Sequence, residues 1–286
     1  MSNYLFPDLT EAWAETRQTL HLYANAIGVI PRAHAEAHPK WWHVSLKTAA
    51  DGLRTETMAL PDGGTFYLRL DLEKHQAVLS VNGRDTQTWD MTAVPTSTEL
   101  GDAVIQAVAG LGLTGEYARQ KFENDEPRQY DTDAAGRFWT AVQAANAVFQ
   151  KHRDRLADAG EDLGIVQLWP HGFDLSFEWY GAKEMAYEEH GETKVYPSQL
   201  NLGFYPGGTP DQQYFYSNPW PFATDDLVRH PLPEGASWHT EGWQGTFFPY
   251  AELVGDEQGT SRLQDFAWKV YEIAKPTLMA CKRSAG

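Results

Sequence analysis

The chain has 286 residues, 42% hydrophobic and 22% charged, a composition typical of a folded globular protein rather than of long disordered segments. Its formal net charge of −16 argues against nucleic acid and anionic lipid membranes as partners, because both require clustered lysine and arginine. The single cysteine, Cys281, excludes an internal disulfide and a cysteine-rich metal site.

The N-terminal segment has none of the features of a secretion signal. Residues 1–8 contain neither a basic stretch nor an apolar core. No apolar run in the chain approaches the length that crosses a membrane. We therefore expect a cytoplasmic protein.

The first half of the chain predicts a helix followed by strands. Apolar residues at spacings of three and four predict a helix from Leu9 that ends at Gly28, and Pro31 and Pro39 bracket a loop after it. Asn82-Gly83 separates two strand-like runs and predicts a type I′ hairpin turn, because both turn positions need positive φ. The predicted strands of this half cover residues 41–46, 65–72, 77–81 and 86–91.

A second helix is predicted over residues 97–110, with Thr96 and Glu99 forming a capping box at its start. The polar segment 116–127 predicts a linker. Beyond it, a long amphipathic helix extends to Leu156, and a last helix closes at Pro276. The strands predicted between these two helices cover residues 165–169, 173–179, 200–205, 213–217 and 246–253.

This order of elements predicts an α+β fold, a largely antiparallel β-sheet with packed helices. The whole chain, 1–286, is expected to form a single compact unit. Because both halves run from helix through strands to helix, we interpret them as two similar α-β-α halves, pseudo-repeats 1–120 and 130–286 joined by the polar linker. One continuous α+β domain without a repeat is the alternative.

A search for known cofactor-binding motifs gives no support for a bound cofactor. Residues 110–115, GLGLTG, match the dinucleotide fingerprint GxGxxG, but the residues before them predict a helix where the motif requires a strand. The sequence contains no Walker-type phosphate loop, no GxSxG elbow and no HExxH. We therefore expect no cofactor and infer no nucleophile.

Three histidines near the first helix were considered as metal ligands. His34 and His38 are four residues apart, and His43 follows closely. Histidines at this spacing share a metal when they lie on one helix, but Pro31 and Pro39 argue against a helix here. Solvated loop histidines are the better interpretation, and no metal site is predicted.

Aromatic residues give the chain its clearest functional signal. Trp42-His43 stands at the start of a predicted strand, and Trp169-Pro170-His171 repeats this arrangement in the second half. Residues 173–179 alternate between apolar and polar side chains, so Asp174 and Glu178 should share one face of a strand. Rings are also dense in the loop-rich segments between residues 204 and 250, where binding residues tend to lie.

These patterns predict a protein that binds a small molecule in an aromatic-lined and acidic cleft. In a stronger form of this hypothesis, the protein is also an enzyme. Its catalytic candidates are Glu178 or Asp174 as acid or base, with His43 or His171 as partner. The main pocket should contain these carboxylates. The ligand-binding candidates are Trp42, Trp169, Tyr205, Tyr216 and Trp243. The alternative is a non-catalytic interaction or structural protein, whose rings are core and whose carboxylates are solvated.

Several segments, in order along the chain, resemble an uncharacterised bacterial family catalogued as domain of unknown function 5996. The resemblance implies a full-length member but brings no activity, cofactor or catalytic residue. One departure is Pro170-His171, where the family usually has small residues after the tryptophan, and this weakens a catalytic role for His171. The matching segments are His38–Val44, Gln129–Asp131, Trp169–Leu175, Gly203–Gly207 and Gly245–Glu252.

Overall fold

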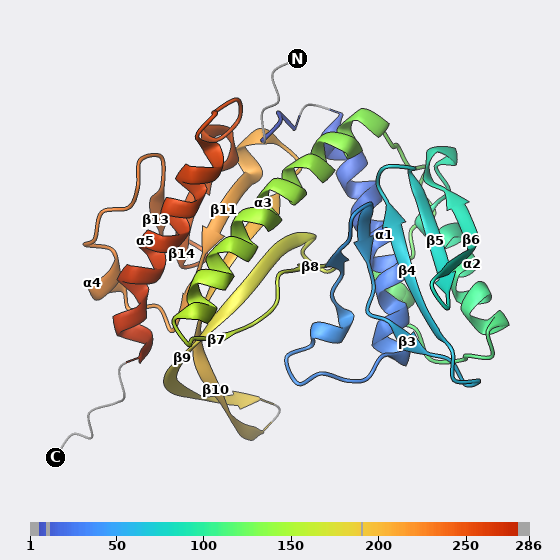
Figure 1. The fold of residues 1–286 in the computed structure, drawn as a ribbon, viewed down its shortest axis with the longest axis horizontal. Helices are drawn as coiled ribbons and strands as arrows, with labels where there is room; N and C mark the ends of the chain where they lie inside the picture. The colour runs from blue at the N-terminus through green and yellow to red at the C-terminus, as the bar shows by residue number, and fades with distance from the viewer. Residues whose placement is uncertain (1–5, 10–11, 190, 280–286) are drawn as a thin grey trace.

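The computed structural model describes residues 6–9, 12–189 and 191–279, and Cys281 lies outside them (Figure 1). The strands form two antiparallel sheets, one in each half of the chain, and helices pack on one face of each sheet. The predicted α+β fold with antiparallel strands and packed helices is therefore confirmed. The strands form two separate sheets rather than one. That the two halves of the chain are pseudo-repeats stays a prediction.

In the first half, α1 (Trp13–His34) and α2 (Ser97–Gly110) cover one face of a sheet whose strands pair largely in chain order. The predicted hairpin turn is confirmed, because Asn82 and Gly83 have φ of 51° and 74°. The predicted capping box at Thr96 is also present. The strands are β1 (Lys47–Thr48), β2 (Gly52–Arg54), β3 (Met58–Ala59), β4 (Thr65–Asp71), β5 (Gln76–Val81) and β6 (Arg84–Asp90).

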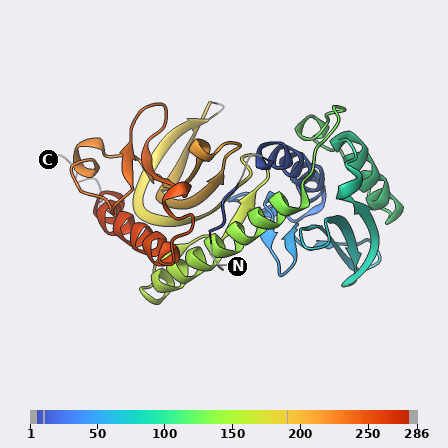
Figure 2. The ribbon, with the colours of Figure 1, turned by 90° about the horizontal axis from the view of Figure 1, so that it is seen from above.

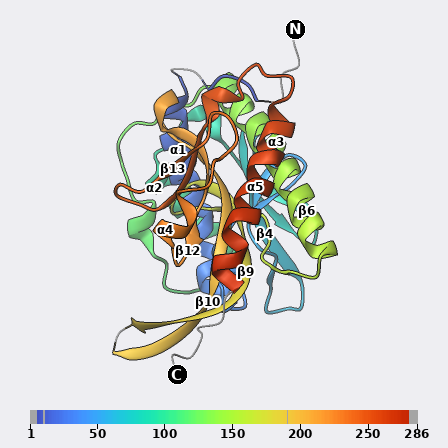
Figure 3. The same ribbon diagram turned by 90° about the vertical axis from the view of Figure 1, so that its left-hand side faces the viewer.

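In the second half, α3 (Thr132–Asp158) and α5 (Gly259–Met279) pack against each other and cover one face of the second sheet. The short helix α4 (Thr224–Leu227) lies beside α5. The strands are β7 (Asp162–Leu163), β8 (Gln167–Trp169), β9 (Asp174–Glu189), β10 (Glu192–Pro206), β11 (Gln213–Ser217), β12 (Pro219–Trp220), β13 (Ser237–His239) and β14 (Gly245–Pro249). The far ends of β9 and β10 extend beyond the body as a two-stranded ribbon (Figure 3).

The two sheets meet at a single antiparallel bridge. Leu46, next to β1, and Leu168, in β8, exchange two backbone hydrogen bonds of 2.8 Å. Figure 2 shows α1 and α2 on one side of the molecule and α3 and α5 on the other. This arrangement brings the first turns of α1 to the face of the second sheet that α3 and α5 leave uncovered.

Two predicted helix limits are wrong. α1 continues past Gly28 and includes Pro31, and α5 likewise passes through Pro276. Gly28 serves close packing, because a Cβ there would lie 3.2 Å from Pro170 Cγ. Each proline lies within one turn of its helix end, where the missing N–H removes a single hydrogen bond.

The strand predicted over residues 41–46 is also wrong. Trp42–Val44 forms a 3₁₀ helix, and Trp41 before it has a φ of 59°. The Ser45 hydroxyl and the Lys47 ammonium both donate to the Trp42 carbonyl, at 2.8 Å and 2.6 Å. These two bonds hold the chain in a tight turn until β1 begins.

The segment expected as a polar linker packs against α2. Phe122 is fully buried in the space that Gly101 leaves beside it. The Ser97 hydroxyl donates to the Phe122 carbonyl at 2.6 Å. The GxGxxG run before this segment begins at Gly110, the last residue of α2, so the strand that a dinucleotide site needs is absent from that position.

Candidate functional site

The predicted alternation along β9 is observed. Asp174, Ser176 and Glu178 lie on the face of the second sheet that is turned away from α3 and α5, and we call this the polar face. Residues between them pack toward the two helices, where Phe177 meets the Phe149 ring of α3. The side chains on this apolar face are at most 2% exposed: Leu175, Phe177 and Trp179.

Tyr216 of β11 reaches Asp174 across an intervening strand. Gly203 of β10 is paired with Ser176 on one side and with Tyr216 on the other. A Cβ at Gly203 would overlap the Tyr216 ring. The missing side chain lets the phenol lie over β10, where its hydroxyl donates a hydrogen bond to Asp174 Oδ2.

Partial burial shifts the pKa of both members of this pair. Burial raises the pKa of the Asp174 carboxyl, and the hydrogen bond from Tyr216 opposes part of that effect. Burial and the neighbouring Asp174 hold the pKa of Tyr216 well above its ordinary value of 10.0, so the phenol remains protonated. Trp169 Nε1 also donates to the Ser176 hydroxyl at 3.1 Å, which places an indole ring beside the pair.

Glu178 lies beyond Ser176 on the polar face, and in the described part of the chain its carboxyl lacks a hydrogen bond like the one that Asp174 accepts. Its Oε2 atom is buried and has no hydrogen-bond partner among the described residues, and the same holds for Nε2 of Gln167 on neighbouring β8. Burial first, and the charge of Asp174 second, raise the pKa of Glu178 to about 7, while Lys40 opposes the rise. A carboxyl with this pKa can take up or release a proton near neutral pH.

A segment from the first half covers the Glu178 end of the face. The Lys40 ammonium lies 3.1 Å from the centre of the Tyr180 ring and 5.7 Å from that of Trp42. Trp42, a predicted binding residue, is therefore part of a cation–π contact that joins the two halves of the chain. The sequence does not single out Lys40 as a site residue, because only the fold places its side chain beside β9.

Half-buried rings continue across the other end of the polar face. Tyr205 and Tyr214 are paired on β10 and β11, with ring centres 5.4 Å apart. Trp243 stacks on Tyr214 with centres 5.9 Å apart and planes at 13°. The structure thus brings four of the five predicted binding residues to one region: Trp169, Tyr205, Tyr216 and Trp243.

Arg17, which the sequence did not single out, comes to this region from α1. Its Nη2 donates to the Tyr205 hydroxyl at 3.1 Å, and its guanidinium lies over the Tyr205 and Phe173 rings at 5.1 Å and 6.0 Å. Burial lowers its pKa. One turn further on, His21 stacks on Phe173 at 5.5 Å. No local pattern marks Arg17, because its partners are distant in sequence.

Among the described residues, neither predicted histidine partner is hydrogen-bonded to a carboxylate of the polar face, although His171 is near enough to Asp174 to lower the pKa of that carboxyl. His43 is 7% exposed, accepts a hydrogen bond from the His38 amide at 3.1 Å and stacks on Trp41. Burial lowers the pKa of His43. His171 is exposed, with its ring 5.8 Å from that of Trp169. Among the described residues, no hydrogen bond joins either histidine to Asp174 or Glu178, so the predicted acid–histidine pairs are not formed in this structure.

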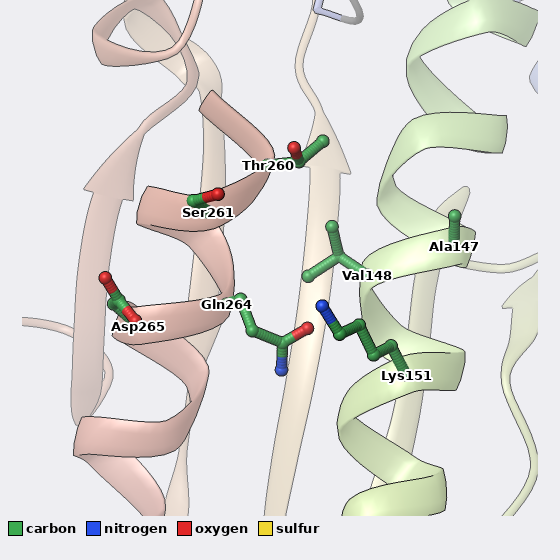
Figure 4. Close-up of a pocket in the computed structure, with 7 residues that line it drawn as sticks. All are labelled: Ala147, Val148, Lys151, Thr260, Ser261, Gln264 and Asp265. Carbon is green, nitrogen blue, oxygen red and sulfur yellow. The ribbon is translucent and has the colours of Figure 1, made fainter. Parts of the chain in front are cut away.

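The expectation that the main pocket contains the carboxylates is wrong. Neither Asp174 nor Glu178 lines any of five well-formed clefts among the described residues, and the most voluminous of these five, about 590 Å³, lies around α5 and Lys183. A cleft of about 540 Å³ includes Trp42 and His43. Another, about 400 Å³, separates α3 from α5, and Figure 4 shows Lys151 and Gln264 extending toward one another across it.

Metal sites and membrane spans were considered over the described ranges. Within them, no group of three or more histidine, cysteine, aspartate or glutamate side chains is placed to hold a metal ion. Across the same residues, no helix combines the length and the apolar character needed to cross a membrane.

Comparison with known proteins gives one match. A family model described as "Family of unknown function (DUF5996)" matches residues 6–279. Neither a curated protein nor a solved structure matches the chain.

Proposed function

The chain belongs to the DUF5996 family, whose function is unknown, and we propose from the polar face of its second sheet that it binds a small molecule there. The ligand contacts are the ring surface around Tyr205 and Tyr214 and the hydrogen-bonding groups of Asp174, Tyr216 and Glu178.

The observation that carries this proposal is the division of aromatic side chains between the two faces of one sheet. Rings on the apolar face are fully buried and serve the core, as expected for strand aromatics. Rings on the polar face keep part of their surface accessible and bear hydroxyl or indole groups that suit a ligand. The first set includes Phe204, Phe215 and Phe248, each 0% exposed, and the second Trp169, Tyr205, Tyr214, Tyr216 and Trp243, all half-buried.

Two unpaired polar atoms of the site indicate which hydrogen-bonding groups the ligand carries. Glu178 Oε2 and Gln167 Nε2 are buried on adjacent strands without partners, and buried polar atoms are normally paired with protein, water or ligand. A ligand hydroxyl beside Glu178 Oε2 would donate to that atom, and one beside Gln167 Nε2 would accept from it. If the ligand is also transformed, Glu178 is the group that we assign as acid or base, since its pKa of about 7 allows either role.

Native mass spectrometry of the purified protein tests this function. We expect a co-purified small molecule that remains on the Trp41→Ala variant and is lost from Trp243→Ala. Trp41 is an equally large ring, 55% exposed, that contacts His43 and Arg32 rather than the rings of the polar face, and it therefore controls for loss of an indole. If no adduct is found, and a library of fluorinated ring fragments shows no binding that Trp243→Ala weakens, the proposal is wrong.

The alternative, a non-catalytic interaction protein, is favoured by a different feature. The ribbon formed by residues 182–189 and 191–197 has strand pairs only within itself among the described residues, and a lone two-stranded ribbon is marginally stable in water. It exposes Tyr187 and Val195, 60% and 57% accessible. Self-association through this ribbon predicts sedimentation that depends on concentration and is abolished by Tyr187→Ser with Val195→Ser. A single concentration-independent species would remove this alternative.

A further inference from the structure

Arg17 is a half-buried cation with an unpaired Nε atom and no acidic partner among the described residues. The protein has 39 acidic and 23 basic side chains, so carboxylates are abundant. Nevertheless, no described carboxylate lies within 4.0 Å of the Arg17 guanidinium, and its Nε atom is buried without a hydrogen-bond partner. A half-buried guanidinium without a counter-ion is unfavourable, so its retention here calls for a reason.

The surroundings of Arg17 fix its side chain without neutralising it. The Tyr205 hydroxyl accepts from Nη2 at 3.1 Å, and Arg17 Cζ lies 5.1 Å from the centre of the Tyr205 ring and 6.0 Å from that of Phe173. Asp174 is close enough to affect the pKa of Arg17, but its Oδ2 is already bonded to Tyr216. A guanidinium that is oriented by stacking and still lacks an anion is arranged for bidentate binding of a carboxylate.

A row of rings leads away from this cation. Arg17 lies on Tyr205, Tyr205 adjoins Tyr214 at 5.4 Å, and Tyr214 stacks on Trp243 at 5.9 Å. Because the Tyr205 and Tyr214 planes are tilted by 45°, a flat ring that lies on Tyr205 meets Tyr214 at its edge, and a substituent at its other end lies beside Arg17. The same face therefore offers stacking surface and a fixed positive charge to one molecule.

We propose that the ligand of the polar face is an aromatic carboxylate, whose ring lies on Tyr205 with Tyr214 at its edge and whose anionic group is bound by Arg17. This inference rests on the proposed function and adds the chemical class of the ligand. It assigns to Arg17 a binding role that no local sequence pattern indicates.

The test compares 4-fluorobenzoate with its neutral counterpart 4-fluorobenzamide by fluorine NMR, at neutral pH and low ionic strength. We expect the full-length protein to bind the acid at least about tenfold more tightly than the amide. Arg17→Gln should remove that preference and leave the amide affinity unchanged. Arg17→Lys should retain only part of it, because an ammonium keeps the charge but loses the planar fork.

The possible outcomes distinguish failure of this inference from failure of the proposed function on which it rests. Equal affinity for both probes, with both weakened by Trp243→Ala, would leave the binding face in place and overturn the anion assignment. An unchanged preference in Arg17→Gln would also overturn it. If neither probe binds and no co-purified molecule is found, the proposed function and the inference fail together. Equal urea midpoints for the variants and the parent show that the comparison concerns folded protein.

Discussion

Tyr216 donates its hydroxyl to Asp174 from two strands away, and it does so over a glycine. Tyrosine side chains rarely cross a neighbouring strand, because a side chain on that strand fills the space. At Gly203 the space is free, and any Cβ would meet the Tyr216 ring. The contact therefore depends on three strands at once, β9, β10 and β11.

The first prediction concerns this glycine. Gly203→Ala should lower the free energy of unfolding by about 1–3 kcal/mol, because the methyl group displaces the Tyr216 ring in a close-packed site. Gly136→Ala is the matched control: its added methyl meets nothing within 4 Å on helix α3. That variant should gain about 0.5–1 kcal/mol. Urea unfolding measures both, and equal effects would show that Gly203 is not required for the crossing.

Removing only the hydroxyl of Tyr216 tests the electrostatics of the pair. In Tyr216→Phe the pKa of Asp174 should rise further, since the hydrogen bond that opposes the effect of burial is gone. Stability should fall by about 1.5–3 kcal/mol at a pH where Asp174 is ionised. Carbon-13 NMR titration of the aspartate carboxyls measures the shift. Tyr214→Phe, which removes a hydroxyl not bonded to Asp174, should leave that pKa in place.

The sequence predicted those features that depend on neighbouring residues. The alternation that places Asp174 and Glu178 on one face has a period of two, and this is visible in a single strand. The turn at Asn82-Gly83 and the cap at Thr96 are equally local. Each of these was therefore found before the fold was known.

The features that the sequence missed depend on register between distant segments. Gly203 was noted only as part of a turn-like motif, because its role appears once β9 and β11 flank it. Arg17 and Lys40 reach the polar face from the first half of the chain. The sequence predicts that the first helix ends at Gly28, before Pro31, and that the last helix closes at Pro276, whereas tertiary packing carries both helices past these residues.

A buried histidine outside the polar face provides a prediction about acid stability. His152 of α3 is 3% exposed, and burial lowers its pKa from 6.5 to about 4. Below pH 6.5 the unfolded chain binds a proton at this residue that the folded chain does not, so stability is lost as the pH falls toward 4. The advantage of the parent over His152→Gln should therefore shrink across this range in urea unfolding. His230→Gln, at an exposed histidine, should keep the slope of the parent.

The contribution of Glu178 to the free energy of unfolding changes with pH in the opposite direction to that of His152. Its pKa rises from 4.5 to about 7 on folding, mainly because burial disfavours the charged carboxylate. Between these two values the folded protein holds a proton that the unfolded chain has released. The stabilisation is thus complete below pH 4.5 and is lost as the pH rises through 7, with an upper limit of about 3 kcal/mol.

The Glu178→Gln variant isolates this effect, because glutamine has a similar shape and does not titrate. Relative to the parent, the variant should gain stability steadily from pH 4.5 to 8, and it should show no such gain below pH 4.5, since the parent is then also neutral at this position. Urea unfolding at a series of pH values measures the difference. Lys40→Met should move the window upward, because the ammonium that favours the charged form is removed. A difference that stays constant with pH would mean that Glu178 titrates as an ordinary carboxylate, and its assignment as the acid or base of the polar face would then be abandoned.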